Sequence, residues 1–424
     1  MTDSGSLRQH SVWMIWGHGV ALTFQALYFI LIGRTLGSRE YGAFVGVVAL
    51  VNVLTQFSSL GMEMILVRNI SRDRRSFAAT WGTSLRVSFY GFLVLLLISL
   101  VVGRLILKPG LCELIPYIAL SDALFGKVTQ LASRAFQGAG QLAYTAKLTA
   151  LTNITRAGAA LLLFVFALLH NLHADVQLWT KIYWLSSLIT AMIAFVAITK
   201  VLGWPKIKKI SRRELMDGLS FSLSSSSISI YNDIDKTFLV SSGQVYAAGI
   251  YAAAYRIIDV ASLPIYAMFT AASPQFFRRG EDGIRNSMPL VNKLLERAIP
   301  YGALLAVGLF LVSPLLPYLF GSSFRESIMA LRWLCLLPLL RGLHYAWGTA
   351  ITGSSSQWYR TATQISAALL NLGLNAWFIP HWSWRGAAIA SLLTDGALAA
   401  SNWMMVRWLN TREHTRRAIT TQAA

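Results

Sequence analysis

Long apolar segments alternate with short polar segments along the whole chain. Each apolar segment has about the twenty residues that a helix needs to cross the hydrocarbon core of a bilayer. This pattern predicts an all-α polytopic membrane protein with about 12 transmembrane helices, and it leaves no stretch long enough for a separate soluble domain. The expected helices cover residues 11–33, 42–66, 78–103, 114–134, 142–169, 178–200, 214–241, 246–271, 296–319, 328–351, 358–379 and 386–409.

A basic segment in the middle of the chain separates two halves of six predicted helices each. The second helix of each half opens similarly, with YGAFVGVVALVN at residues 41–52 and AGIYAAAYRIID at residues 248–259. Because each half starts on the same side of the membrane and has an even number of spans, the predicted repeat is parallel. We therefore expect an N-terminal six-helix lobe (1–202), a cytoplasmic linker (203–213), a C-terminal six-helix lobe (214–410) and a basic cytoplasmic tail (411–424).

The net charge of +19 reflects membrane topology. The basic residues form short clusters between apolar spans, such as Arg72, Arg74 and Arg75, and they do not cover one soluble face. Nucleic acid is therefore not an expected partner. Most of the clusters fall in alternate loops, and the positive-inside rule then places both termini in the cytoplasm.

Motifs typical of catalysis or metal binding are absent from the sequence. Cys112 and Cys335 give neither a metal-ligand spacing nor a disulfide framework. There is no glycine-rich phosphate loop followed by Lys-Ser or Lys-Thr, and no GxSxG or HExxH motif. We therefore expect no catalytic residue, no metal, no cofactor and no enzymatic activity.

Charged residues inside the predicted spans are the most informative feature of the chain. Asp233, Asp235 and Lys236 lie in an otherwise apolar segment, and Arg256 and Asp259 follow at i, i+3 in the next span. A charge in hydrocarbon costs roughly 2.5 to 3.5 kcal/mol on insertion scales, so such side chains face a cavity or another part of the protein. Two interpretations remain open: a structural set of ion pairs, or cations that contact a ligand.

Three further spans carry polar residues at helical spacing. In the tenth span, Pro338 removes a backbone hydrogen bond just before Arg341 and His344, which predicts a helix break. Two other spans carry polar stripes, which face a wet cavity or another helix more often than lipid, and interhelical packing alone stays open as an explanation. These stripes are Asn52, Gln56, Ser59 and Glu63 in the second span, and Thr145, Thr149, Thr152 and Arg156, with Lys147 nearby, in the fifth.

The intramembrane cations have few carboxylates near them in sequence, as Lys127, Lys147, Arg156, Arg332 and Arg341 illustrate. This imbalance predicts a basic cavity, which suits an anionic ligand such as a phosphate or diphosphate. An exporter of cationic drugs would instead need an excess of carboxylates. The candidate substrate contacts are Lys236, Arg256, Arg341, Lys147, Arg156 and Lys127, with Asp235, Asp233, Asp259 and Glu63 as candidate supporting groups.

Several segments resemble a known family. The segments GRTLGSREYG (33–42) and LGMEMILVRNISR (60–72) come first, then an Asn-x-x-Asp-basic pattern and a Gly-x-Tyr-x-x-Ala pattern, and later LFGSSF (319–324) and NLGLNAWFIPHWSWRGAAIA (371–390). The two patterns are formed by Asn232, Asp235 and Lys236 and by Gly249, Tyr251 and Ala254. In this order and spacing, the chain resembles the Wzx-type polysaccharide flippases of the multidrug/oligosaccharidyl-lipid/polysaccharide (MOP) exporter superfamily. One departure is HWSWRG (381–386), which is bulkier than the family's short glycine turn.

The resemblance implies a V-shaped, MATE-like pair of six-helix lobes in the bacterial inner membrane. By alternating access it would move undecaprenyl-diphosphate-linked oligosaccharide to the outer leaflet for O-antigen, capsule or exopolysaccharide synthesis. The implied partners are this lipid-linked glycan, the lipid bilayer, and a polysaccharide polymerase and co-polymerase. The superfamily also implies coupling to protons or sodium, for which Glu63, Asp235 and Asp259 are candidate sites. Two alternatives stay open: a small-molecule exporter of the same superfamily, and a membrane-embedded polymerase or acyltransferase of the same pathway.

Overall fold

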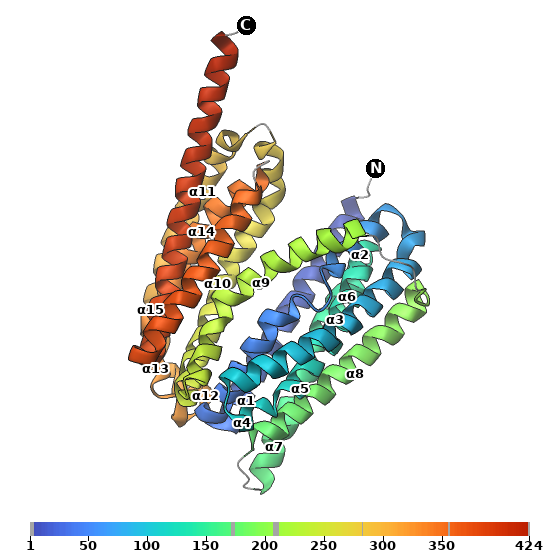
Figure 1. Cartoon of the computed structure of the whole chain (residues 1–424), viewed down its shortest axis with the longest axis vertical. Helices are drawn as coiled ribbons and strands as arrows, with labels where there is room; N and C mark the ends of the chain where they lie inside the picture. Colours follow the sequence, from blue (N-terminus) through green and yellow to red (C-terminus); the bar gives the residue numbers. More distant parts are fainter. Residues whose placement is uncertain (1–3, 171–173, 207–211, 282, 355–356, 423–424) are drawn as a thin grey trace. The chain divides into compact units, whose positions relative to one another are not determined.

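The computed structural model describes residues 4–170, 174–206, 212–281, 283–354 and 357–422, and these ranges contain helices and no β-strand (Figure 1). The all-α prediction is confirmed. Six helical stretches in the described part are long and apolar enough to cross a membrane, so the chain is a multi-pass membrane protein, and the prediction of about 12 spans is consistent with the fold. These stretches are Gly19–Thr55, Arg74–Ile106, Leu142–His170, Val176–Leu202, Val245–Gly280 and Ile284–Phe320.

The chain forms two compact units, each with its own apolar core. Unit 1 consists of Met1–Ser229 and Leu319–Gly321. One of its cores is built around Met62, Leu66, Trp81 and Phe136, which come from α2, α3 and α6. The helices of unit 1 are α1 (Ser4–Thr55), α2 (Met62–Arg72), η1 (Arg74–Ser76), α3 (Phe77–Ile106), α4 (Pro109–Cys112), α5 (Ile115–Ala119), the π-helix η2 (Leu120–Gly126), α6 (Lys127–Gly138), α7 (Leu142–His170), α8 (Val176–Leu202) and the first part of α9 (Arg212–Ser241).

Unit 2 consists of Ile230–Tyr318 and Ser322–Ala424. Its core includes Phe269, Phe276, Val291 and Ile351, which come from α10, α11 and α14. Besides the second part of α9, its helices are α10 (Val245–Gly280), η3 (Ile284–Ser287), α11 (Met288–Val312), η4 (Ser313–Leu315), α12 (Leu316–Phe320), η5 (Ser322–Phe324), α13 (Ser327–Leu334), α14 (Leu337–Gly353) and α15 (Gln357–Gln422). The end of α12 belongs to unit 1.

Two of the long helices each join two predicted spans, in whole or in part. Within α1 the chain turns at Gly37 (φ 70°), between the first and second predicted helices. Within α15 it turns at Ser383 (φ 55°, ψ −137°), between the last two. The predicted break in the tenth span is confirmed, since α13 ends at Leu334 and α14 starts at Leu337 with Pro338 in its first turn.

The prediction of a continuous second helix over residues 42–66 is wrong. Helix α1 ends at Thr55 and α2 begins at Met62. Between them Leu60 and Gly61 have left-handed backbone angles (φ 44° and 66°), which no α-helix accommodates. The loop at residues 56–61 therefore interrupts the predicted polar stripe, and only its last two members, Ser59 and Glu63, form a hydrogen bond with each other, of 2.7 Å.

The division between the units falls inside α9, whereas the sequence suggested a boundary in the linker. The first part of α9 belongs to unit 1 because its backbone lies against the loop at 56–61, at Gly218, and because the Ser226 hydroxyl donates to the Val53 carbonyl over 3.0 Å. Residues 207–211 of the predicted linker lie outside the described residues. Of the predicted tail, the part up to Gln422 continues α15. The predicted lobe limits stay a prediction.

Candidate functional site

Charged side chains from α9, α10 and α14 meet inside unit 2. We call this group the α9–α10 cluster: Asp233, Asp235, Lys236, Arg256, Asp259 and Arg341. At its buried end the Lys236 amine donates to Asp233 over 2.9 Å and to the Asn232 carbonyl over 2.8 Å. It also lies 3.4 Å from Asp235 and 4.3 Å above the centre of the Tyr255 ring. Asn232 and Asp233 lie four and three residues before Lys236, so the lysine side chain contacts the preceding turn of its own helix.

Asp235 connects this buried end to two other helices. The Tyr251 hydroxyl of α10 donates to Asp235 Oδ2 over 2.5 Å, and Ser391 of α15 lies 2.9 Å from the same hydroxyl. Both Asp235 and Lys236 are fully buried. Each charge therefore has an opposite charge and hydrogen-bond partners at hand, which a buried ion pair requires for stability.

At the other end of the cluster, one carboxylate faces two guanidinium groups. Arg341 Nη1 lies 3.0 Å from Asp259 Oδ1, and Arg256 Nη1 lies 3.7 Å from Asp259 Oδ2. Arg341 also donates to the Tyr255 hydroxyl over 2.9 Å. The Asp259 side chain is 39% exposed and that of Arg341 only 7%. These three residues, the shared-aspartate triad, carry a net charge of +1 at the accessible end of the cluster.

A second polar group in unit 2 lies on α14 and α15. His344 Nε2 is 3.2 Å from Asp395 Oδ1, and Asn402 donates to the His344 carbonyl over 3.2 Å. Arg360 lies in α15 and packs against Gly348. Its Nη1 atom is buried without a hydrogen-bond partner among the described residues. Sequence reasoning did not identify Asp395, although a single carboxylate in an apolar span was an available signal.

Unit 1 contains a buried ion pair between α2 and α6. Lys127 Nζ lies 2.6 Å from Glu63 Oε1, and Ser59 donates to the same oxygen over 2.7 Å. Both charged side chains are buried. The pair therefore connects the loop at 56–61 and α2 to the start of α6.

A second ion pair of unit 1 involves the π-helix η2. Arg156 of α7 donates to Asp122 over 2.8 Å, and the Tyr183 hydroxyl of α8 donates to the same oxygen over 2.8 Å. The guanidinium also lies 4.7 Å from the centre of the Tyr183 ring. Asp122 belongs to η2, and π-helical turns often occur at functional sites. Sequence reasoning did not single out Asp122 or Tyr183.

The expectation that the intramembrane cations lack carboxylate partners is wrong for Lys127, Arg156 and Arg341. Their partners come from other helices and are distant in sequence, so local sequence could not reveal them. Lys147 is exposed and lies 5.5 Å from the centre of the Tyr144 ring. Arg332 lies over the Phe310 ring, 4.7 Å from its centre. Whether any of these cations contacts substrate stays a prediction.

In the described part of the chain, no group of three or more His, Cys, Asp or Glu side chains is placed to hold a metal ion. Residues 7–279, well over half of the chain, match the family described as polysaccharide biosynthesis protein. The chain belongs to this family. The predicted kinship with the flippases of the MOP superfamily is thereby confirmed at family level, and the Wzx type stays a prediction. No curated protein sequence is significantly similar to this member of the polysaccharide biosynthesis family.

Solved structures with the same fold are transporters of the MOP superfamily. A multidrug resistance MATE family transporter in its inward-facing conformation shares 18% identity, with a TM-score of 0.72 and coverage of 92% of this chain and 98% of its own. The outward-facing conformation of such a transporter shares 18% identity, with a TM-score of 0.64 and coverage of 97% of this chain and 100% of its own. A MOP superfamily transporter from Pyrococcus furiosus shares 19% identity, with a TM-score of 0.63 and coverage of 97% of this chain and 99% of its own. The binding pocket of that transporter is described as having reverse polarity, which suggests a different function. At these identities the likeness shows the fold, which is MATE-like.

Proposed function

We propose that this protein is a flippase that moves undecaprenyl-diphosphate-linked oligosaccharide units from the inner to the outer leaflet of the bacterial inner membrane by alternating access. The products would serve O-antigen, capsule or exopolysaccharide synthesis. Membership of the polysaccharide biosynthesis family supports the pathway. The single observation that supports an anionic substrate is the shared-aspartate triad, in which one carboxylate serves two guanidinium groups.

The chemistry of the triad suits a diphosphate. Guanidinium groups bind phosphate oxygens through paired, charge-assisted hydrogen bonds, and such bonds are about twice as strong as neutral ones. Arg256 and Arg341 approach one carboxylate from two helices, so an anion with several oxygens can replace Asp259 between them. Because Asp259 is the most exposed member of the triad, it can return to water when a phosphate takes its place.

Topology, partners and energy source are part of the same proposed function. Both termini would lie in the cytoplasm, and a polymerase and co-polymerase would receive the flipped glycan. The protein would act as a transporter and not as an enzyme. Glu63, Asp235 and Asp259 are the candidate sites for coupling to protons or sodium; among these, Asp259 combines exposure with a direct contact to a proposed substrate ligand.

The decisive test neutralises the triad one arginine at a time. We expect Arg256→Gln and Arg341→Gln each to slow translocation by about tenfold to a hundredfold, since a hydrogen bond to a charged group contributes roughly 1.5 to 3 kcal/mol. The matched control is Arg385→Gln, an exposed arginine of the same unit that lies over the Trp384 ring. The measurement is the fraction of lipid-linked glycan that a membrane-impermeant sugar-oxidising reagent reaches in spheroplasts lacking their own flippase, at equal levels of each variant.

Equal glycan exposure in all three variants would contradict the proposal. The small-molecule exporter makes a different prediction. In that case the triad variants would lose efflux of a small molecule, and the distribution of the lipid-linked glycan between the leaflets would be the same with and without the protein. The polarity of the binding pocket would also distinguish the two functions, as the description of the Pyrococcus furiosus transporter suggests for that protein.

A further inference from the structure

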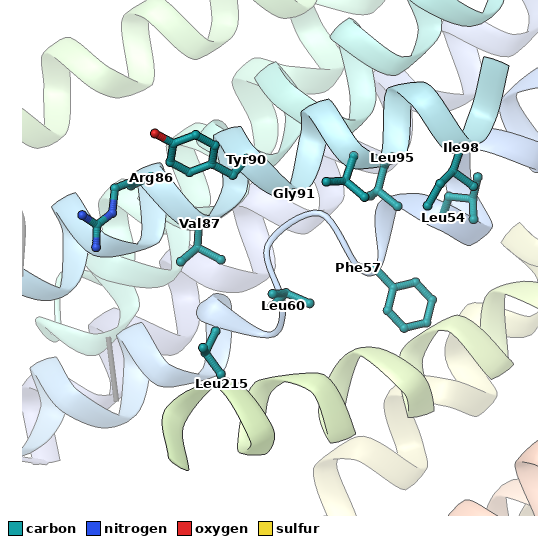
Figure 2. Close-up of a pocket in the computed structure, with 11 residues that line it drawn as sticks. Leu54, Phe57, Leu60, Arg86, Val87, Tyr90, Gly91, Leu95, Ile98 and Leu215 are labelled. Carbon is teal, nitrogen blue, oxygen red and sulfur yellow. The ribbon is translucent and has the colours of Figure 1, made fainter. Parts of the chain in front are cut away.

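Unit 1 contains an apolar pocket that the proposed transport chemistry does not use. It has a volume of about 580 Å³, within the range typical of ligand pockets, and lies among the end of α1, the loop at 56–61, α3 and the start of α9 (Figure 2). Its lining is aliphatic and aromatic, for example Leu54, Phe57, Val94 and Leu215, with Arg86 as the one charged residue.

Close backbone contacts fix the walls of this pocket. A Cβ atom at Gly91 of α3 would overlap the Ser58 carbonyl, and one at Gly218 of α9 would overlap the Leu60 carbonyl. The loop is thus held between α3 and α9 at two glycines, where its backbone takes the left-handed conformation at Leu60 (φ 44°). The shape of the cavity is therefore set by the backbone contacts of the loop with α3 and α9.

The pocket opens on the exposed apolar face of α3. Three of its lining residues, Tyr90, Val94 and Ile98, are exposed, and so are their neighbours Leu97 and Val101. Helix α3 lies in one of the stretches apolar and long enough to cross the membrane. In such a helix, exposed aliphatic residues face hydrocarbon, so lipid chains have direct access to the pocket.

Arg86 lies at one end of the pocket lining and Ile98 at the other (Figure 2). At 1.5 Å per residue they are about 18 Å apart along α3, close to half the thickness of a 30 Å hydrocarbon core and hence to the depth of one lipid chain. Arg86 is also only about 14 Å from Phe77, where α3 begins beside the basic turn Arg74–Ser76. A long arginine side chain can extend its guanidinium from this depth toward the headgroup region.

We propose that this pocket binds an acyl chain of an anionic phospholipid from the surrounding bilayer, with the lipid phosphate at Arg86. The apolar length accepts the chain, and the arginine complements the headgroup at the side of the membrane predicted to be cytoplasmic. That leaflet carries the anionic lipids that attract basic residues near a membrane surface. The bound acyl chain would hold the loop at 56–61 and the first part of α9 in place.

The test uses the full-length protein in nanodiscs with phosphatidylglycerol that carries a photoreactive group midway along one chain. Cross-linked peptides are quantified by mass spectrometry at residues 54–60, 86–98 and 215. We expect Val94→Trp, which fills the pocket, to lower labelling there about tenfold, the loss expected when about two methylene groups are excluded. The matched control is Leu97→Trp: Leu97 is 64% exposed on the same helix, Val94 is 57% exposed, and Leu97 does not line the pocket.

The charge is tested separately. We expect Arg86→Gln to lower the preference for phosphatidylglycerol over phosphatidylcholine about fivefold, the effect of one basic residue near an anionic surface. Arg104→Gln, at the other end of α3, is expected to leave that preference unchanged. Equal labelling in the two tryptophan variants overturns the proposed site. Displacement of phosphatidylglycerol by undecaprenyl phosphate, with no displacement in the reverse direction, overturns the proposed occupant and assigns the pocket to the substrate's own chain.

Discussion

The buried pair Glu63–Lys127 gives the sharpest prediction on stability. Its oppositely charged atoms are 2.6 Å apart, both side chains are buried, and Ser59 donates a hydrogen bond to the same carboxylate oxygen. Lys127→Met replaces the amine by an apolar side chain of similar length. It leaves the Glu63 carboxylate buried without its counter-charge.

The expected loss follows from this burial. Breaking a buried ion pair by removing one partner costs about 3 to 5 kcal/mol. At about 2 to 4 °C per kcal/mol for a unit of this size, Lys127→Met should lower the melting temperature by roughly 6 to 20 °C. The double variant Glu63→Leu with Lys127→Met removes both charges, and such replacements are often neutral or stabilising. We therefore expect the double variant to melt within about 3 °C of the unchanged protein.

The measurement is the loss of monodisperse protein on size-exclusion chromatography after heating in detergent. Lys147→Met is the control, because Lys147 is exposed and its cation–π interaction with Tyr144, at 5.5 Å, is worth about 1 kcal/mol or less. Equal stability of Lys127→Met and Lys147→Met would contradict the expected cost of the unpaired carboxylate, and so would a double variant as unstable as the single one. A stable double variant that still translocates glycan would also exclude Glu63 as the coupling site.

Two further predictions concern unit 1 and the helix backbones. Asp122→Asn should lower the melting temperature by about 2 to 8 °C, because the isosteric amide removes the charge opposite Arg156. The partial exposure of this pair limits the loss of stability to about 1 to 2 kcal/mol. Equal melting temperatures of the variant and the unchanged protein would contradict the ion-pair assignment. Gly218→Ala should destabilise the protein by about 1 to 3 kcal/mol, since the added Cβ overlaps the Leu60 carbonyl, whereas Gly373→Ala in α15 has open space and should gain about 0.5 to 1 kcal/mol. Heating curves of the two alanine variants that shift in the same direction would argue against the close contact.

Hydropathy was sufficient to predict most of the long helices, because each transmembrane helix must satisfy its own backbone hydrogen bonds and expose apolar side chains to lipid. The break at Pro338 was also predicted, because a proline has no backbone N–H and is visible in the sequence. The break at 56–61 was missed because it contains no proline. Its cause is the left-handed backbone at Leu60 and Gly61, held by contacts with α3 and α9 that only the folded chain creates.

The ion pairs could not be predicted for a related reason. Among the intramembrane cations that the structure describes, Lys236 and Arg256 have a carboxylate partner within four residues on their own helix, and those contacts were visible at helical spacing. The partners of Lys127 and Arg156 are 64 and 34 residues away in the chain. Pairing across helices is set by packing, and a single sequence contains no direct signal of it. The apparent excess of unpaired cations was a consequence of this limit.

If the proposed function is correct, the carboxylate partners of the buried cations determine where a diphosphate can bind. A buried cation whose carboxylate is withdrawn loses several kcal/mol, so an anion can bind at low cost only where it replaces the carboxylate in the same step. The Glu63–Lys127 pair is buried on both sides and offers no such exchange. Asp259 does, because it is 39% exposed and can be rehydrated as phosphate takes over the nearly buried Arg341. The triad is therefore the place where substrate binding and the release of a carboxylate, to water or to a coupling ion, can be one event.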